Sequence, residues 1–235
     1  MRNVTNILFD LDGTLTDPAE GIVRCIQHSL TILNHPCPPS EELTRYIGPP
    51  LRDAFVSICN SSDEVLIERA VEIFRERFST KGLFENAPYA EVAQMLTDLG
   101  SYQLYVATSK PQAYAEKILK HFKLADYFIE IHGNDLAGRL DDKAELVREL
   151  RERRGLVPGE TIMVGDRKHD VIAAKKNGVI SLGVSYGYGS KEELVEAGVD
   201  YLCESPAEVV RQVIDIDSNR RKKLSEAAKC NESLR

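Results

Sequence analysis

The sequence lacks the features that mark membrane, zinc-binding or disulfide-rich proteins. It has no apolar run near the roughly 18 residues that a membrane-spanning helix needs, so we expect no membrane partner. Its five cysteines are odd in number and show no C-x-x-C spacing, which argues against zinc and a disulfide framework. The formal net charge is −7, so nucleic acid is not an expected partner. No signal-peptide-like apolar segment opens the chain, which predicts a cytoplasmic location.

Short apolar runs alternate with helical patterns from residue 90 onward, and one further apolar run opens the chain. The predicted strands are Thr5–Phe9, Tyr102–Ala107, Tyr127–His132, Thr161–Val164, Ile180–Val184 and Tyr201–Cys203. Strands that alternate with helices favour a parallel sheet with right-handed crossovers. The predicted fold class is therefore α/β.

Residues 16–86 interrupt this pattern, because they contain no convincing strand. Asp17-Pro18-Ala-Glu20 predicts a helix start in which Asp17 is the N-cap and Glu20 completes a capping box. Further helices are predicted near 41–46, 51–58 and 63–78. The predicted division is a core of residues 1–15 and 87–215, a helical insertion of residues 16–86, and a polar C-terminal tail of residues 216–235.

The stretch Ile-Leu-Phe-Asp-Leu-Asp-Gly-Thr-Leu-Thr-Asp (7–17) is the most informative. On a strand, Asp10 and Asp12 point to the same side, at the carboxyl end where open α/β sheets bind ligands. Two carboxylates this close repel each other unless a cation lies between them or one is protonated. Oxygen ligands favour Mg²⁺, and a carboxylate can attack a phosphoryl group. The alternative is an Asp-rich turn that closes a buried strand.

A second pair of carboxylates follows the strand predicted at 161–164. Asp166 and Asp170 are four residues apart, a spacing that places both on one face of a helical turn. Thr108 and Ser109 follow the strand predicted at 102–107, and they offer hydroxyls and free N–H groups at a helix start, which suits an anion. Lys143 heads another predicted helix. Because each group follows a strand or opens a helix, we expect them to share one site.

These motifs, in this order, resemble those of the haloacid dehalogenase-like hydrolases, in particular their phosphatase branch. The matching residues are Asp10-Leu-Asp12-Gly13-Thr14, Thr108, Lys143, and Gly165-Asp166 with Asp170. The segments Tyr-Ile-Gly-Pro-Pro (46–50), Thr-Ser-Lys-Pro (108–111), Val-Gly-Asp-Arg-Lys-His-Asp (164–170) and Tyr-Gly-Tyr-Gly (186–189) are similar to those of the phosphoglycolate phosphatase and 5′-nucleotidase-like subgroup. The resemblance spans roughly residues 5–210. It implies a Rossmann-like three-layer parallel core whose helical insertion is a cap over the active site.

The resemblance implies a Mg²⁺-dependent phosphatase that acts on a small phosphorylated metabolite. Asp10 is the implied nucleophile, which forms an aspartyl-phosphate, and Asp12 is the general acid and base. Asp10, the carbonyl of Asp12 and the side chain of Asp166 are the implied Mg²⁺ ligands. Asp170 is expected to orient that metal shell or Lys143.

Phosphate and substrate contacts are expected from both parts of the chain. The implied set is Gly13, Thr14, Thr108, Ser109 and Lys143 from the core, with Arg52 from the cap. Arg52 is included because its guanidinium fork suits a second anionic group of the substrate. Arg139 is a rival to Lys143 for the place beside the nucleophile.

Several alternatives stay open at this stage. Cleavage of phosphonates is set aside, because the related enzymes need a cap lysine and residues 14–80 contain none. A phosphomutase, or a phospho-switch in which Asp10 is phosphorylated without turnover, uses the same scaffold. Phosphoglycolate, a 5′-nucleotide, pyrophosphate and a sugar phosphate all fit the motifs. The choice between monomer and homodimer is also open.

Overall fold

The computed structural model describes residues 3–48, 50–135 and 142–232, and the side chains of residues 3–222 within those ranges. Its centre is a sheet of six strands in the order β5-β4-β1-β6-β7-β8, and every neighbouring pair is parallel. The strands are β1 (Asn6–Phe9), β4 (Gln103–Pro111), β5 (Glu130–Asn134), β6 (Thr161–Gly165), β7 (Ile180–Val184) and β8 (Tyr201–Cys203). The six predicted strands are confirmed, and so is the α/β fold class.

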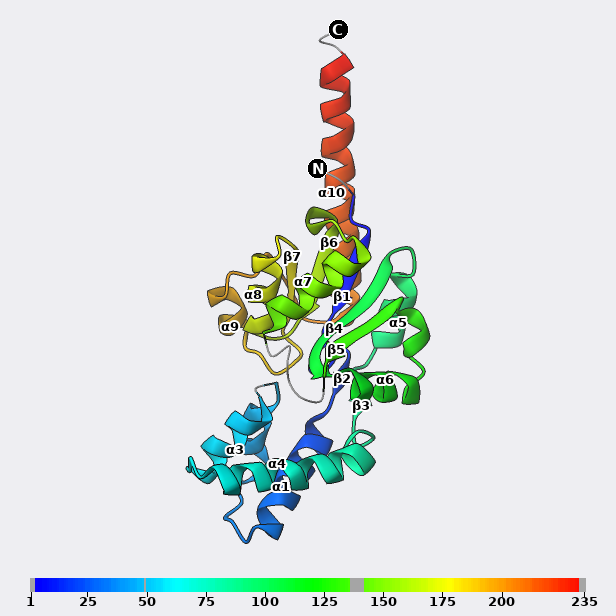
Figure 1. Cartoon of the computed structure of the whole chain (residues 1–235). Helices are drawn as coiled ribbons and strands as arrows, with labels where there is room; N and C mark the ends of the chain where they lie inside the picture. Colours follow the sequence, from blue (N-terminus) through cyan, green and yellow to red (C-terminus); the bar gives the residue numbers. More distant parts are fainter. Residues whose placement is uncertain (1–2, 49, 136–141, 233–235) are drawn as a thin grey trace.

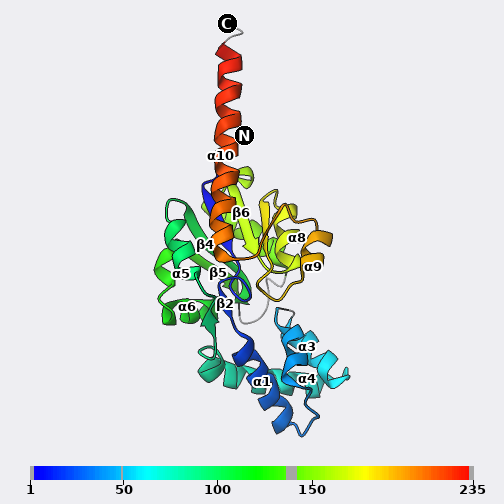
Figure 2. The same cartoon turned by 180° about the vertical axis from the view of Figure 1, so that it is seen from behind.

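Helices cover both faces of this sheet, so the core has three layers (Figures 1 and 2). The helices are α5 (Val92–Asp98), α6 (Gln112–His121), α7 (Lys143–Arg154), α8 (Lys168–Lys176), α9 (Lys191–Glu196) and α10 (Pro206–Glu232). Leu8 points into a cluster with α7 and α8, whereas Ile7 and Phe9 point into the opposite cluster with α5, α6 and α10. This alternation is the period of two that a strand imposes. Because both faces are covered, Ile7, Leu8 and Phe9 of β1 are all apolar and fully buried, and Asn6 at its start is its one buried polar residue.

Strand β1 lies inside the sheet, at the point where the order of the strands reverses. The chain adds β4 and then β5 on one side of β1, and β6, β7 and β8 on the other. The loops that follow β1, β4 and β6 therefore meet at one edge, which is the usual ligand position in an open parallel sheet.

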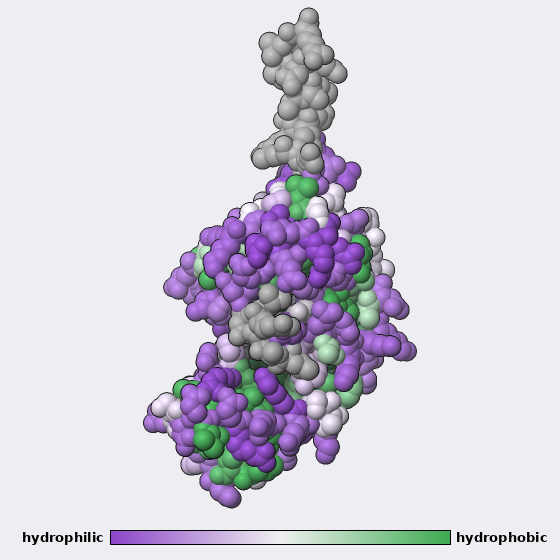
Figure 3. Space-filling model, viewed as in Figure 1, coloured by the Kyte–Doolittle hydropathy of each residue, from purple (hydrophilic) through white to green (hydrophobic). Residues whose placement is uncertain are grey.

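A group of helices, here called the helical insert (residues 18–86), lies apart from the sheet in both views (Figures 1 and 2). It contains α1 (Ala19–Ile32), α2 (Ser40–Leu43), a 3-10 turn (Thr44–Tyr46), α3 (Leu51–Cys59), α4 (Glu64–Arg77) and a π-helical turn (Phe78–Gly82). The surface in Figure 3 is mostly hydrophilic, with hydrophobic patches on the insert.

The segments that lead into and out of the helical insert pair with each other. Strand β2 (Thr16–Asp17) runs antiparallel to β3 (Ala87–Pro88), with Thr16 opposite Pro88 and Asp17 opposite Ala87. The sequence predicted no strand in residues 16–86, so β2 corrects that expectation. Strands of two residues are too short to show a period, and tertiary pairing alone defines them.

Two predicted boundaries also shift. Helix α1 begins at Ala19 with Pro18 in the cap position, and the predicted capping box is absent from the described side chains. The Asp17 carboxylate still accepts the Ala19 N–H at 3.0 Å. At the other end, α10 continues without a break across residue 216 and projects beyond the sheet (Figure 1). Of the helices described, none combines the length and apolar character needed to cross a membrane.

Candidate active site

The first pair of carboxylates lies at the carboxyl end of β1. The Asp10 N–H donates to the Val164 carbonyl at 2.9 Å, so the ladder between β1 and β6 fixes this backbone. The side chain of Asp10 is largely buried, and its Oδ1 accepts the Leu11 N–H at 2.8 Å. The chain then turns through Gly13, whose φ of 82° favours glycine. The buried centre of the sheet thus holds the proposed nucleophile rigidly.

Lys143 joins the two halves of the site. It is the first residue of α7, and its Nζ lies 2.8 Å from Asp10 Oδ2 and 2.5 Å from Asp170 Oδ1. Burial alone would lower the pKa of Lys143, but the carboxylates of Asp10 and Asp170 outweigh it and raise that pKa, so the side chain is an ammonium. Within the described residues, Lys143 is therefore the cation beside Asp10. Its rival Arg139 lies outside the described residues.

The carboxylate of Asp170 contacts the Lys143 ammonium and the backbone of Arg167. Its Oδ2 accepts the Arg167 N–H at 3.0 Å, and its Oδ1 faces the Lys143 ammonium. Burial, more than any other cause, raises the pKa of Asp170 to about 6. Asp170 thus forms an ion pair with Lys143 through Oδ1, an oxygen that accepts no hydrogen bond within the described residues, and this contact is consistent with one of the two supporting roles expected from the sequence.

Asp166 follows β6 and is fully buried. Its Oδ2 accepts the Tyr188 N–H at 2.8 Å, and its Oδ1 has no hydrogen-bond partner among the described residues. Burial, and then the negative charges of Asp170 and Asp10, raise the pKa of Asp166 to about 8. The backbone at Gly13 and Gly187 approaches this carboxylate so closely that a Cβ atom at either position would collide with it. A confined, buried and unpartnered oxygen of this kind is satisfied either by a bound cation or by a proton on the carboxyl group.

Asp10, Asp166 and Asp170 each offer an oxygen, and these three atoms lie within 4.8 Å of one another. When the three carboxylates are ionised, the single ammonium of Lys143 leaves an excess of two negative charges. A divalent cation with oxygen ligands matches both this charge and this donor set. Asp166 contributes an oxygen that has no hydrogen-bond partner among the described residues, so it is the clearest candidate ligand, with Asp10 and Asp170 beside it.

Asp12 has a lysine of its own, which the sequence did not assign. Lys110 is the residue before the last one of β4, and its Nζ lies 2.5 Å from Asp12 Oδ2. Burial raises the pKa of Asp12, although the charge of Lys110 opposes the rise. No local signal in the sequence identifies this partner, because the register of β4 is irregular between Thr108 and Pro111.

The hydroxyl groups predicted to bind phosphate differ in their surroundings. Thr14 is fully buried, and its Oγ1 has no partner within the described part of the chain. Thr108 is almost fully buried at the end of β4, where its Oγ1 accepts the Lys110 N–H at 3.2 Å. Ser109 is exposed. The structure thus brings Thr14 and Thr108 to the edge of the sheet that carries Asp10.

Arg52 is placed elsewhere. It lies on α3, and its guanidinium pairs with Glu64 and Glu68 of α4 on the surface of the insert. The described contacts of Arg52 are to these two glutamates, and none of them reaches the sheet edge that carries Asp10. Its predicted part in substrate binding therefore gains no support from the structure.

The insert meets the site through a different arginine. The Arg167 Nη1 donates to the Ile47 carbonyl at 2.9 Å, and its Nε donates to Glu193 Oε1 at 2.9 Å. Gly48, with φ of 103°, packs directly against this guanidinium. Arg167 follows Asp166 in sequence, so residues 47–48 of the insert are attached next to the predicted metal ligand.

Comparison with known proteins identifies this arrangement. A family model described as haloacid dehalogenase-like hydrolase matches residues 7–184. The chain belongs to this family. The hydrolase is 42% identical over 212 residues to a protein of Pseudomonas aeruginosa named 5′-nucleotidase, a match that covers 89% of this chain and 95% of that protein.

Two further relatives frame its chemistry. The solved structure of a predicted phosphatase from Clostridium acetobutylicum has a TM-score of 0.85 and 40% identity, and the match covers 91% of the hydrolase and 99% of that chain. A protein of Mycobacterium tuberculosis named tyrosine-protein kinase PtkA is 31% identical over 218 residues, which cover 91% of the hydrolase and 70% of that protein. Phosphatase relatives and the family's motifs together support hydrolysis of phosphate esters.

Proposed function

We propose that the hydrolase is a Mg²⁺-dependent phosphomonoesterase that acts through an aspartyl-phosphate on Asp10. The observation that carries this proposal is the pair of carboxylates at the end of β1, each matched with its own buried lysine. Lys143 faces Asp10 and Lys110 faces Asp12. Two neighbouring carboxylates in distinct surroundings can take distinct roles, one as nucleophile and one as proton carrier.

In the first step, a carboxylate oxygen of Asp10 attacks phosphorus, and the bond from phosphorus to the ester oxygen breaks. Asp12 donates a proton to the departing oxygen, so an alcohol leaves and an acyl-phosphate remains. In the second step, Asp12 takes a proton from water, whose oxygen attacks phosphorus and releases phosphate and free Asp10. Lys143 offsets the negative charge that gathers around Asp10 in both steps.

The fit of a divalent ion to this site rests on Asp10 and on the unpartnered Oδ1 of Asp166. Mg²⁺ bound there would supply positive charge against the phosphoryl oxygens. The buried hydroxyl groups of Thr14 and Thr108 are the donors proposed for those oxygens. The carbonyl of Asp12 remains a proposed third ligand.

The helical insert is proposed to act as the cap that admits and selects the leaving group. Its Ile47 and Gly48 lie against Arg167, beside Asp166, and its Phe78 lies against Lys110, beside Asp12. A lid at this position would exclude water while the acyl-phosphate forms. The substrate class we propose is a small phosphorylated metabolite. 5′-Nucleotides come first because a relative at 42% identity bears that name, and phosphoglycolate comes second.

The test is phosphate release from a panel of monoesters, with Mg²⁺ and with a chelator. Wild type is compared with Asp10→Asn and with Asp98→Asn, which removes an exposed carboxylate on α5. We expect Mg²⁺-dependent release that Asp10→Asn abolishes and Asp98→Asn leaves intact. Release that persists in Asp10→Asn would contradict the nucleophile. A labelled acyl-phosphate that accumulates on wild type without release would contradict the hydrolytic cycle and favour a switch or a mutase.

A further inference from the structure

The ion pair between Lys110 and Asp12 has no assigned purpose in the mechanism above. We propose that Lys110 is a positioning residue, which orients the Asp12 carboxylate for proton transfer and links that orientation to the helical insert. The inference rests on the proposed phosphomonoesterase activity and concerns how its acid and base is held.

The first observation is the unequal treatment of the two Asp12 oxygens. Oδ2 lies 2.5 Å from the Lys110 ammonium, whereas Oδ1 is buried and lacks a hydrogen-bond partner within the described residues. A carboxylate tethered at one oxygen has little freedom to rotate, so its second oxygen keeps one direction. Proton transfer needs such an oxygen within hydrogen-bond reach of the leaving group. Oδ1 is the atom that fits this need.

The second observation is that Lys110 is itself held from two sides. Its backbone N–H donates to Thr108 Oγ1 at 3.2 Å, which ties it to the predicted phosphate-binding threonine. Its ammonium lies 4.9 Å from the centre of the Phe78 ring, close enough for a cation–π contact. The Lys110 side chain is only 7% exposed, so solvent screens neither contact much.

The third observation concerns where Phe78 belongs. It begins the π-helical turn that ends the insert, and its ring stacks on Phe74 of α4 at 5.3 Å. The same ring meets the edge of Tyr114 on α6 at 5.7 Å. A displacement of the insert would therefore move Phe78, free the Lys110 ammonium and loosen Asp12. The acid and base is correctly held only while the insert is in place.

The test compares Lys110→Met, which removes the charge but keeps an unbranched apolar stem over Phe78, with Lys191→Met. Lys191 pairs with Glu204 on the surface, so it is a matched lysine outside the site. We expect Lys110→Met to lower kcat for an alkyl phosphate by about 10- to 100-fold, part of the range for general acid–base catalysis, with KM little changed. Lys191→Met should match wild type. Lys110→Arg, which keeps a cation, should recover part of kcat.

A second measurement separates positioning from simple support of the fold. With p-nitrophenyl phosphate the leaving group departs without a proton, so the first-turnover burst of p-nitrophenol should fall much less in Lys110→Met. If Lys110 acts through Asp12, the burst rate of Asp12→Asn/Lys110→Met should equal that of Asp12→Asn. A slower burst in the double variant would overturn the proposal. So would a raised KM with unchanged kcat in Lys110→Met, since it would make Lys110 a substrate ligand.

These outcomes are distinct from a failure of the proposed function. If wild type released phosphate from no ester, the phosphomonoesterase assignment would fall and the positioning role would fall with it. If wild type were active and Lys110→Met matched it on the alkyl phosphate, only the role of Lys110 would be wrong.

Discussion

The six-stranded sheet with its flanking helices, here called the sheet domain, and the helical insert place their charged side chains differently. The sheet domain buries ionisable side chains together, and the set comprises Asp10, Lys143, Asp166 and Asp170. The insert places its ion pairs of α3 and α4 at the surface, and its interior is apolar, with Phe55 and Phe74 in edge contact. Its deepest described ion pair, Arg77 with Glu85, lies where it rejoins the sheet domain.

This difference indicates that the sheet domain supplies the charged groups of the site and that the insert supplies apolar packing. Buried charges are expensive to desolvate, so a protein keeps them where function requires them. The insert carries no comparable cluster in its described residues, and its contribution is the apolar packing that keeps Phe78 in place. Substitutions of each kind should therefore fail in different ways, and four predictions test that distinction.

The largest effect is expected from Lys143→Met in the sheet domain. The change leaves Asp10 and Asp170 buried without their shared cation, so the free energy of unfolding in chelator should fall by about 3–5 kcal/mol. Phosphatase activity should fall more than about a hundredfold, because the charge near Asp10 is lost. Urea unfolding and phosphate release measure both effects. Lys176→Met, which removes an exposed partner of Asp142, is the control and should change neither.

Next is Phe74→Ala in the insert, which should reduce stability through packing alone. Phe74 is buried between the rings of Phe55 and Phe78, so the cavity should cost about 3–5 kcal/mol in unfolding free energy. Phe84→Ala removes a ring that is 45% exposed and should have little effect. Equal unfolding midpoints for Phe74→Ala and wild type would show that the insert does not depend on its aromatic packing.

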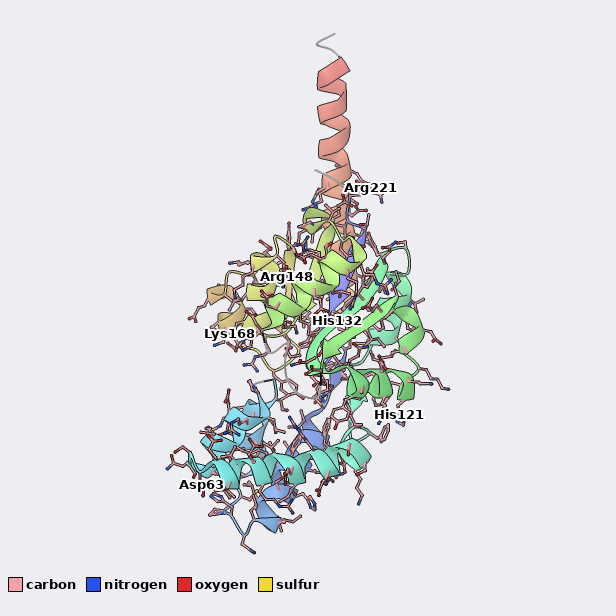
Figure 4. All side chains as sticks on the ribbon, in the orientation of Figure 1. Asp63, His121, His132, Arg148, Lys168 and Arg221 are labelled. Carbon is pink, nitrogen blue, oxygen red and sulfur yellow. The ribbon has the colours of Figure 1, made fainter. Side chains whose placement is uncertain are left out.

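A smaller effect is expected from pH at His132, a buried histidine of β5 in the sheet domain (Figure 4). Burial, and then the positive charge of Arg153, lower the pKa of His132. The unfolded chain therefore binds a proton below about pH 6.5 that the folded protein does not bind, so stability falls as the pH drops through that value. His132→Gln should reduce the loss of stability between about pH 7 and pH 5.

Chemical unfolding at several pH values measures this difference. His28→Gln, at an exposed position of α1, is the control and should keep the wild-type pH dependence. The same pH dependence in His132→Gln and wild type would mean that His132 does not titrate differently on folding.

The smallest effect is expected from Arg52→Gln on the surface of the insert. Arg52 pairs with Glu64 and Glu68 in contact with solvent, so kcat/KM should stay at the wild-type value and stability should change little, least of all at high salt. Steady-state kinetics on substrates with and without a second anionic group measure this. A loss confined to the doubly anionic substrates would restore the substrate role that the sequence predicted.

The sheet was predictable because its strands are apolar and its ends are polar. Asp10, Asp166 and Thr108 follow such runs directly, and a parallel sheet brings strand ends to one edge whatever the loops do. Strand β4 extends further than predicted, since Thr108 pairs with Gly133 and Pro111 with Asn134 across an irregularity. The polar residues and proline of that extension hid it from a search for apolar runs.

The contacts between side chains far apart in sequence were harder to predict. Lys110 pairs with Asp12 across β1 and β4, and nothing local to Lys110 indicates that partner. Arg52 was assigned because its guanidinium fork suits an anionic group, yet its position on α3 directs it toward α4. In Figure 4, Asp63 caps α4 at the outer end of the insert, well away from the sheet edge. Rotation about a helix axis separates such neighbours, and one sequence does not fix it.

The short pair of β2 and β3 has an evolutionary consequence. Thr16 and Asp17 lie opposite Pro88 and Ala87, so the chain leaves the sheet domain and returns to it at neighbouring points. Insertions tolerated by a fold characteristically begin and end close together. The chain can thus follow the same path through the sheet whatever segment is inserted between β2 and β3. Descendants of one ancestor can lengthen, trim or exchange these helices, and so acquire new substrates, while they inherit the same chemistry.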